Sequence, residues 1–146
     1  MPSFQFRLAP VLRLRERVKE EKQFELRALY IERTQLEEEI GDLLARSESL
    51  GLAFAPTDGA VVTAAELQLI DDYAQLLDRQ IARKRAALSS LCERLIKKQQ
   101  EFTEAAREVK SLEVLRQRLA EKFRRAQNLE EQKFLDEIGQ RKFTRQ

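Results

Sequence analysis

Few residues of this chain are suited to catalysis or metal binding. The sequence contains no histidine and a single cysteine, Cys92. It therefore offers no imidazole base or ligand, and one thiol makes neither an internal disulfide nor a cysteine-rich zinc site. Asp136 and Glu137 are carboxylates able to exchange protons, but neighbouring residues of a helix point about 100° apart and no pocket pattern surrounds them. The sequence thus predicts no enzyme, no metal centre and no cofactor, and Cys92 is interpreted as a small residue in helix packing.

The most regular feature is a heptad repeat that runs from Leu67 to Ala126. Its first positions are Leu67, Ala74, Ile81, Leu88, Leu95, Phe102, Val109, Arg116 and Phe123. Its fourth positions are Ile70, Leu77, Lys84, Leu91, Lys98, Ala105, Leu112, Leu119 and Ala126. Only Lys84, Lys98 and Arg116 are not apolar, and neither proline nor glycine interrupts the repeat. Such a seam predicts a long helix that keeps one apolar stripe against a partner helix.

The composition agrees with this interpretation. Charged residues make up 36% of the 146 residues, the net charge is +2, and there are only 4 glycines and 3 prolines. This composition is typical of a long helix or coiled coil. No run reaches the roughly 20 apolar residues of a membrane span, and the start, MPSFQFRLAP, lacks the apolar core of a secretory signal. We therefore expect a cytoplasmic protein without direct membrane insertion. The balanced, alternating charge argues against nucleic acid as a partner.

A first helix is predicted from about residue 10 to residue 50. Its heptad leucines are Leu29, Leu36, Leu43 and Leu50. Pro10 suits the first turn of a helix, where its missing N–H is not needed. A start near Ser3 with a bend at Pro10 is the alternative.

Residues 51–62 are predicted to form a loop. Gly51 suits a helix end, and Pro56 and Gly59 suit turns. Thr63 and Glu66 have the spacing of a capping box, which predicts a second helix from about residue 63 to residue 141.

The expected fold is all-α: a long antiparallel two-helix coiled coil, or helical hairpin, that forms one domain over residues 1–146. Folding the chain about residue 55 gives a register that can be tested. It places Leu43 beside Leu67, Ile40 beside Ile70, Leu36 beside Ala74, Leu29 beside Ile81, Arg33 beside Leu77 and Leu26 beside Lys84.

In this register the second helix overhangs the first, which ends opposite about residue 102. The apolar residues beyond that point are Phe102, Val109, Leu112, Leu115, Leu119 and Phe123. Burying each of them is worth about 1.5–3 kcal/mol, so we expect the overhang to bind another protein or a second copy of the chain. In the alternative, residues 1–9 fold back over part of the overhang through Phe4 and Phe6.

Both ends of the chain resemble one known family. The stretch EQKFLDEIGQR at residues 131–141, and the opening FQFRL at residues 4–8 followed by VLRLRE at residues 11–16, are similar to the two ends of the FliJ family of the flagellar type III export apparatus. The helices between them are generic coiled coil. Gly139 departs from the alanine that is more usual in the family, which predicts fraying of the last turn.

The resemblance implies a concrete role in flagellum biogenesis, protein transport and, through them, chemotaxis. Members of the family are similar in architecture to the central stalk of rotary ATP synthases. They are non-enzymatic and cytoplasmic, peripheral at the inner face of the cell membrane. They bind and stimulate the hexameric export ATPase, and they contact the cytoplasmic domain of the export gate and the export chaperones. The implied ATPase-binding residues are Leu112, Leu119, Phe123, Leu135 and Ile138, and the implied gate-binding residues are Leu43, Leu50, Tyr73 and Leu77.

Two other interpretations remain open at the level of sequence. One is the equivalent stalk protein of a virulence-type secretion system. The other is a homodimeric coiled-coil scaffold in which two overhangs pair, although Lys98 and Arg116 would place like charges together in such a seam.

Overall fold

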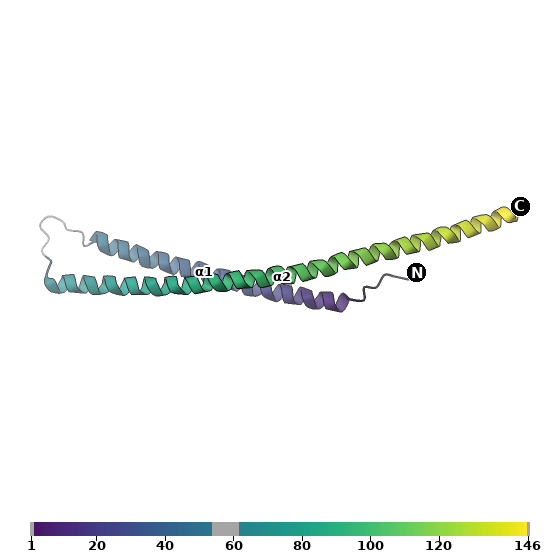
Figure 1. Cartoon of the computed structure of the whole chain (residues 1–146). Helices are drawn as coiled ribbons and strands as arrows, with labels where there is room; N and C mark the ends of the chain where they lie inside the picture. The colour runs from purple at the N-terminus through teal and green to yellow at the C-terminus, as the bar shows by residue number, and fades with distance from the viewer. Residues whose placement is uncertain (1, 54–61, 146) are drawn as a thin grey trace. The chain divides into compact units, whose positions relative to one another are not determined.

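The computed structural model describes residues 2–53 and 62–145 of the chain. They contain two helices, α1 (Ala9–Ala53, 45 residues) and α2 (Ala64–Thr144, 81 residues), and no strand is found in these two ranges (Figure 1). Parts of α1 and α2 that are far apart in sequence pack against each other in opposite directions. The predicted all-α helical hairpin is therefore confirmed.

The helix ends differ slightly from the sequence prediction. α1 begins at Ala9, so Pro10 lies in its first turn, and residues 2–6 are not helical. The predicted break at Gly51 is not observed, because α1 continues to Ala53. α2 likewise continues through Gly139 to Thr144, three residues beyond the predicted end. The turn predicted at Pro56 and Gly59 lies outside the described residues.

The capping box at the start of α2 is present as predicted. The Glu66 backbone N–H donates to the Thr63 hydroxyl oxygen at 3.2 Å, and the Thr63 N–H donates to the Glu66 carboxylate at 3.3 Å. Two backbone donors that the helix itself leaves free are thus satisfied reciprocally, which fixes where α2 begins.

The chain divides into two compact units. The loop-end unit is Lys22–Glu101, and the terminal unit combines Met1–Glu21 with Phe102–Gln146. Each unit contains a stretch of α1 and a stretch of α2.

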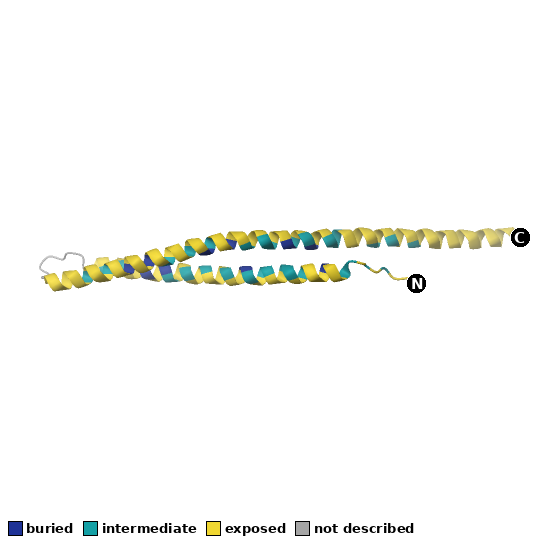
Figure 2. Ribbon diagram, turned by 60° about the horizontal axis from the view of Figure 1, so that its bottom comes forward, coloured by how far each residue is buried: buried dark blue, intermediate teal, exposed yellow. Residues whose placement is uncertain are grey.

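The core of the loop-end unit is the predicted heptad seam. Its buried residues are Leu26, Ile40, Leu43, Leu77, Ile81, Leu91 and Leu95 (Figure 2). Leu77 and Leu91 are the most completely enclosed, with 1% and 0% of their surface exposed. Leu43, Leu77 and Ile81 form one cluster, against which Leu50 packs. Both helices contribute to this cluster, so the seam holds the two chain segments together.

The predicted register of the two helices in this unit is wrong. Leu43 packs with Leu77 and Ile81, whereas Leu67, its expected partner, is 57% exposed. Lys84 pairs with Glu39 at 2.6 Å instead of lying beside Leu26, a displacement of 13 residues along α1. When the apolar positions repeat every seven residues, sliding one helix along the other by two heptads again brings apolar residues face to face. The apolar pattern alone therefore does not fix the register.

Charged pairs between the helices distinguish the observed register. Besides Lys84 and Glu39, Lys98 pairs with Glu25 at 2.9 Å and Lys22 pairs with Glu101 at 3.1 Å. In the predicted register, Lys84 would have faced a leucine. Arg33, which was expected beside Leu77, instead lies near Cys92 and Leu95 with its guanidinium 5.0 Å from the Tyr30 ring centre.

The predicted overhang of α2 beyond about residue 102 is also too long. Leu12 of α1 is buried together with Ala105 and Val109 of α2, and Arg15 pairs with Glu108 at 3.0 Å. Val109 was expected to have no partner within the chain, but only 3% of its surface is exposed. The error follows from the register, because a displaced α1 covers a later part of α2.

Candidate functional site

No catalytic or metal-binding arrangement is found in residues 2–53 and 62–145. These ranges hold no group of three acidic, cysteine or histidine residues that could ligate a metal ion. Cys92 is a free, partly buried thiol next to Leu91, and Asp136 and Glu137 are exposed. Neither α1 nor α2, as described, has a stretch long and apolar enough to cross a membrane. The candidate sites are therefore exposed surfaces.

The first surface is a shallow apolar groove in the loop-end unit. We call it the loop-end groove, and it is lined by Leu50, Leu69, Ile70, Asp72, Tyr73 and Leu76. Tyr73 is 42% exposed and Leu69 is 72% exposed, although both are large and apolar. The capping box of α2 positions this groove, because it fixes the first turns of the helix that supplies most of the lining.

The structure separates the four residues implied in gate binding. Leu50 and Tyr73 line the loop-end groove. Leu43 and Leu77 are 8% and 1% exposed in the core cluster against which Leu50 packs. All four lie in the same part of the loop-end unit, but only Leu50 and Tyr73 present surface to a partner.

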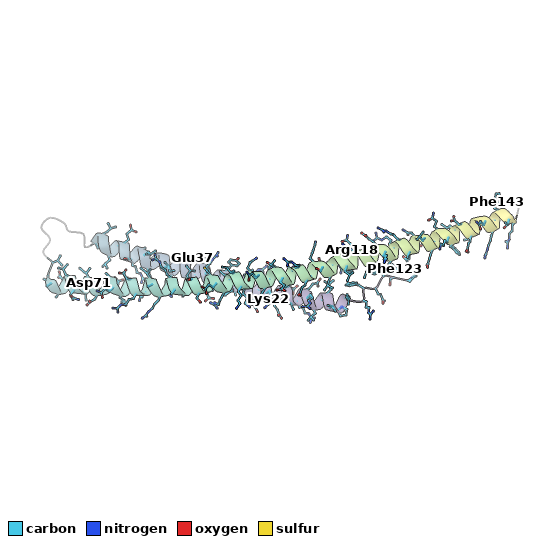
Figure 3. All side chains as sticks on the ribbon, viewed as in Figure 1. Lys22, Glu37, Asp71, Arg118, Phe123 and Phe143 are labelled. Atoms are coloured by element: carbon cyan, nitrogen blue, oxygen red, sulfur yellow. The ribbon has the colours of Figure 1, made fainter. Side chains whose placement is uncertain are left out.

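The groove lies in a strongly acidic part of the chain. Residues 40–78 contain seven acidic residues and one basic residue, Arg46. Asp71, labelled in Figure 3, and its neighbour Asp72 are near the start of α2. They accept hydrogen bonds from Gln75 and Gln68 at 3.1 and 3.0 Å. The apolar lining therefore has negative charge beside it, which favours a partner segment with apolar and basic side chains.

The second surface belongs to the terminal unit, where the N-terminal segment, residues 2–8, lies along α2. Phe4, Phe6 and Leu8 are partly buried while Gln5 and Arg7 are exposed, the alternation of an extended chain with one face on a helix. The Phe4 ring centre is 5.8 Å from that of Phe123. The contact agrees with the alternative in which residues 1–9 fold back over the overhang. The preferred prediction had expected Phe123 to have no partner within the chain.

A hydrogen bond that the sequence did not reveal completes this contact. The Gln127 side-chain amide donates to the Pro2 carbonyl at 2.9 Å. The alternation of Phe4, Phe6 and Leu8 was visible in the sequence, but no pattern in it pointed to Gln127. From residue 128 to residue 145, every described residue is exposed (Figure 2). We call residues 128–144 the C-terminal arm.

The five residues implied in ATPase binding fall into two groups. Leu112 and Phe123 are partly buried within the terminal unit. Leu119, Leu135 and Ile138 are exposed by 40%, 65% and 37%. The C-terminal arm also exposes Leu129, Phe134 and Phe143. These uncovered apolar residues make the C-terminal arm a candidate surface for a partner.

An ion-pair network in the loop-end unit has a structural role instead. Lys98 lies 2.9 Å from Glu25 and 3.2 Å from Glu101, and Lys22 also pairs with Glu101. The hydrogen bond with Lys98 lowers the pKa of Glu25, and the bond with Lys22, followed by that with Lys98, lowers the pKa of Glu101. The same bonds, first with Glu25 and then with Glu101, raise the pKa of Lys98. Each partner thus favours the charged form of the other, which holds the network ionised near neutral pH.

Together these features define an all-helical hairpin protein whose candidate sites are exposed helix faces. A comparison with protein families matches residues 4–146, nearly the whole chain, to the family described as Flagellar FliJ protein. The chain belongs to the FliJ family, and its general role is that of a flagellar export-type stalk protein. Comparisons with curated proteins and with solved structures gave no match.

Proposed function

We propose that this protein is the non-enzymatic stalk of the flagellar type III export apparatus. It binds and stimulates the hexameric export ATPase through the terminal unit. It contacts the cytoplasmic domain of the export gate through the loop-end groove, and it also binds export chaperones. It works in the cytoplasm, at the inner face of the cell membrane. Membership of the FliJ family supports the general role, and the following observations support the assignment of surfaces.

The observation that carries the ATPase assignment is the bare C-terminal arm. Every described residue of the arm is exposed, including Leu135 and Ile138. A partner that covers these exposed apolar residues would stabilise the arm. A single helix is about 10–12 Å across, a shape suited to insertion into the lumen of a ring.

The loop-end groove supports a separate contact with the gate. It is apolar, lies in an acidic part of the chain, and presents Leu50 and Tyr73. The groove belongs to the loop-end unit, whereas the arm belongs to the terminal unit. The two proposed contacts therefore use different residues and can be disrupted independently.

The ATPase contact is tested with Leu135→Asp combined with Ile138→Asp in the full chain. The matched control is Gln132→Asp combined with Gln140→Asp, which adds the same charge to the arm without removing apolar surface. We expect the first variant to lose binding to the purified flagellar export ATPase and stimulation of ATP hydrolysis, and the control to retain both. Equal binding and stimulation by wild type and the leucine–isoleucine variant would refute the assignment of the arm.

The gate contact is tested with Tyr73→Asp and, as control, Gln75→Asp. We expect Tyr73→Asp to weaken binding to the isolated cytoplasmic domain of the gate while ATPase stimulation stays at the wild-type level. If Tyr73→Asp reduces ATPase stimulation and leaves gate binding intact, the two surfaces have been assigned the wrong way round.

A further inference from the structure

The two compact units carry opposite net charge. The terminal unit has 16 basic and 11 acidic residues, a net charge of +5, and the loop-end unit has 11 basic and 14 acidic residues, a net charge of −3. The overall charge of +2 conceals this asymmetry.

Much of the excess positive charge of the terminal unit lies on one short stretch of α2. Residues 116–125 contain five cations, Arg116, Arg118, Lys122, Arg124 and Arg125, and one acid, Glu121. All five cations are exposed, and none of them forms an ion pair with a residue that the structure describes. The N-terminal segment alongside does not neutralise them, because its one charged residue is Arg7. Like charges this close on a helix repel each other, so the stretch would be stabilised by an anionic partner.

Three of these cations form a row with leucines at both ends. Arg118, Lys122 and Arg125 follow one another at spacings of four and three residues, so they lie on one face of α2. We call them the basic stripe. Leu115 and Leu129 continue the same row at its two ends and are 38% and 58% exposed. Phe123 is on another side of the helix, beside the N-terminal segment (Figure 3).

A second basic run in the chain lies beside acidic residues and serves as a comparison. Residues 79–85 include Arg79, Arg83, Lys84 and Arg85. There α1 supplies acids: Lys84 pairs with Glu39, and Arg83 lines the same depression as Glu39 and Asp42. In this run Lys84 has an ion-pair partner on α1, whereas no cation of the basic stripe forms an ion pair with a residue that the structure describes.

We propose that the basic stripe, with Leu115 and Leu129, binds a carboxylate-rich surface of a partner protein. Arginine is favoured in protein interfaces because its planar guanidinium binds carboxylates through two parallel hydrogen bonds. The exposed leucines favour a protein over a bare polyanion, since they would be buried only against an apolar surface. A membrane-bound helix would separate its apolar and basic residues onto opposite faces, whereas here they share one row.

This inference rests on the proposed function only for the identity of the partner. If the terminal unit enters the export ATPase, the stripe names the chemistry expected on the surface it meets, which is a cluster of aspartates and glutamates. Because exposed charges act over a screening length of about 8 Å at physiological salt, the contact should weaken as salt is added.

The test compares two full-length variants with the same change of charge. One reverses the stripe with Arg118→Glu, Lys122→Glu and Arg125→Glu, and the control reverses Arg79→Glu, Arg83→Glu and Arg85→Glu. We expect the stripe variant to bind the purified export ATPase at least about tenfold more weakly than wild type at low salt, and the control to stay within about twofold. Circular dichroism checks that both variants remain helical.

A second probe separates the failure of this inference from the failure of the proposed function. A fluorescent oligoglutamate peptide should bind wild type and the control in a salt-dependent manner, and should not bind the stripe variant. Suppose that only the stripe variant loses peptide binding and that wild type does not bind the ATPase at all. This result would overturn the proposed function but support the basic stripe as a binding site for carboxylates. ATPase binding that is equal in wild type and the stripe variant would overturn the stripe.

The same variants distinguish the other anionic partners. Wild type is titrated with vesicles that contain phosphatidylglycerol and with a short DNA duplex. Binding to either that is stronger than binding to the ATPase and the peptide, and that is lost in the stripe variant, would overturn a protein partner in favour of a membrane or a nucleic acid.

Discussion

The loop-end unit and the terminal unit use the same helix α2 in different ways. In the loop-end unit, α2 buries Leu77, Ile81, Leu91 and Leu95, and its Lys84 and Lys98 pair with glutamates of α1. In the terminal unit, α2 buries Ala105 and Val109, then meets an extended segment at Phe123, and is fully exposed from residue 128. One heptad seam runs through both units, so the difference arises from what each part of α2 meets. An apolar repeat indicates that a helix has a packing face, but it does not identify the partner.

The largest effect on stability is expected at Leu91 of the loop-end unit, in contrast to Leu135 of the terminal unit. Leu91 is 0% exposed and Leu135 is 65% exposed. We expect Leu91→Ala to lower the free energy of unfolding by about 2–5 kcal/mol, because it leaves a cavity between the helices. Leu135→Ala should change it by less than about 0.5 kcal/mol. Urea unfolding followed by circular dichroism measures both, and equal losses would contradict the contrast between the units.

The next effect concerns the register of the loop-end unit. In a Cys92→Ser background, Leu43→Cys with Ile81→Cys should form a disulfide readily, and Leu43→Cys with Leu67→Cys should not. Adding Lys84→Leu and Lys98→Leu removes the ion pairs with Glu39 and Glu25. We then expect the second cross-link, between residues 43 and 67, to form as well as the first, between residues 43 and 81. Non-reducing electrophoresis measures the two products.

If the second cross-link stays absent after both lysines are replaced, shape matching in the core fixes the register without the charges. Lys97→Leu with Arg85→Leu is a suitable control. It also makes two cations of the same helix apolar, but neither residue pairs with a glutamate of α1 in the described part of the chain.

A smaller effect is expected at the N-terminal segment. Phe4→Ala removes the ring contact with Phe123, a pair worth about 0.5–1.5 kcal/mol. Hydrogen exchange of the α2 amides around Phe123 should become faster, while exchange around Leu91 stays unchanged. Phe134→Ala, at a phenylalanine that is 62% exposed, serves as the control. Unchanged exchange near Phe123 would show that the segment does not protect α2.

The smallest effect is the pH dependence of the ion-pair network. The folded pKa values of Glu25 and Glu101 lie below their ordinary value of 4.5, so their stabilisation is complete above that value and is lost as the pH falls. The folded pKa of Lys98 lies above 10.5, so its stabilisation is complete below that value and is lost as the pH rises. We expect Lys98→Met to lower the melting temperature at neutral pH and to approach wild type near about pH 3. Lys97→Met should run parallel to wild type across the same range.

Much of the fold was predictable because it depends on local patterns. Leu77, Ile81, Leu91 and Leu95 were assigned to the seam from their spacing alone, and all four are buried. Thr63 and Glu66 were identified as a capping box, whose hydrogen bonds depend only on residues three apart. Such features need no knowledge of which other segment is nearby.

The relations between distant segments were harder to predict. The apolar repeat was compatible with more than one register, and the ion pair of Lys84 with Glu39, which accompanies the observed register, is invisible until the helices are aligned. Because the register was displaced, Val109 was wrongly expected to lack a partner. Leu43 and Leu77 were implied in gate binding by resemblance, but both occupy heptad positions, which favoured internal packing, and both are enclosed in the core.

The ion pairs between the helices also bear on how such a chain can change in length. Glu25 is separated from Glu39 by 14 residues, and Lys84 is separated from Lys98 by the same number, so two heptads of one helix match two heptads of the other. Seven residues inserted into one helix would keep the apolar stripe in phase but separate one of the pairs. Insertions and deletions between the pairs are therefore tolerated only when both helices change together. The arm after residue 127 has no such counterpart, so its reach can be lengthened or shortened without any compensating change.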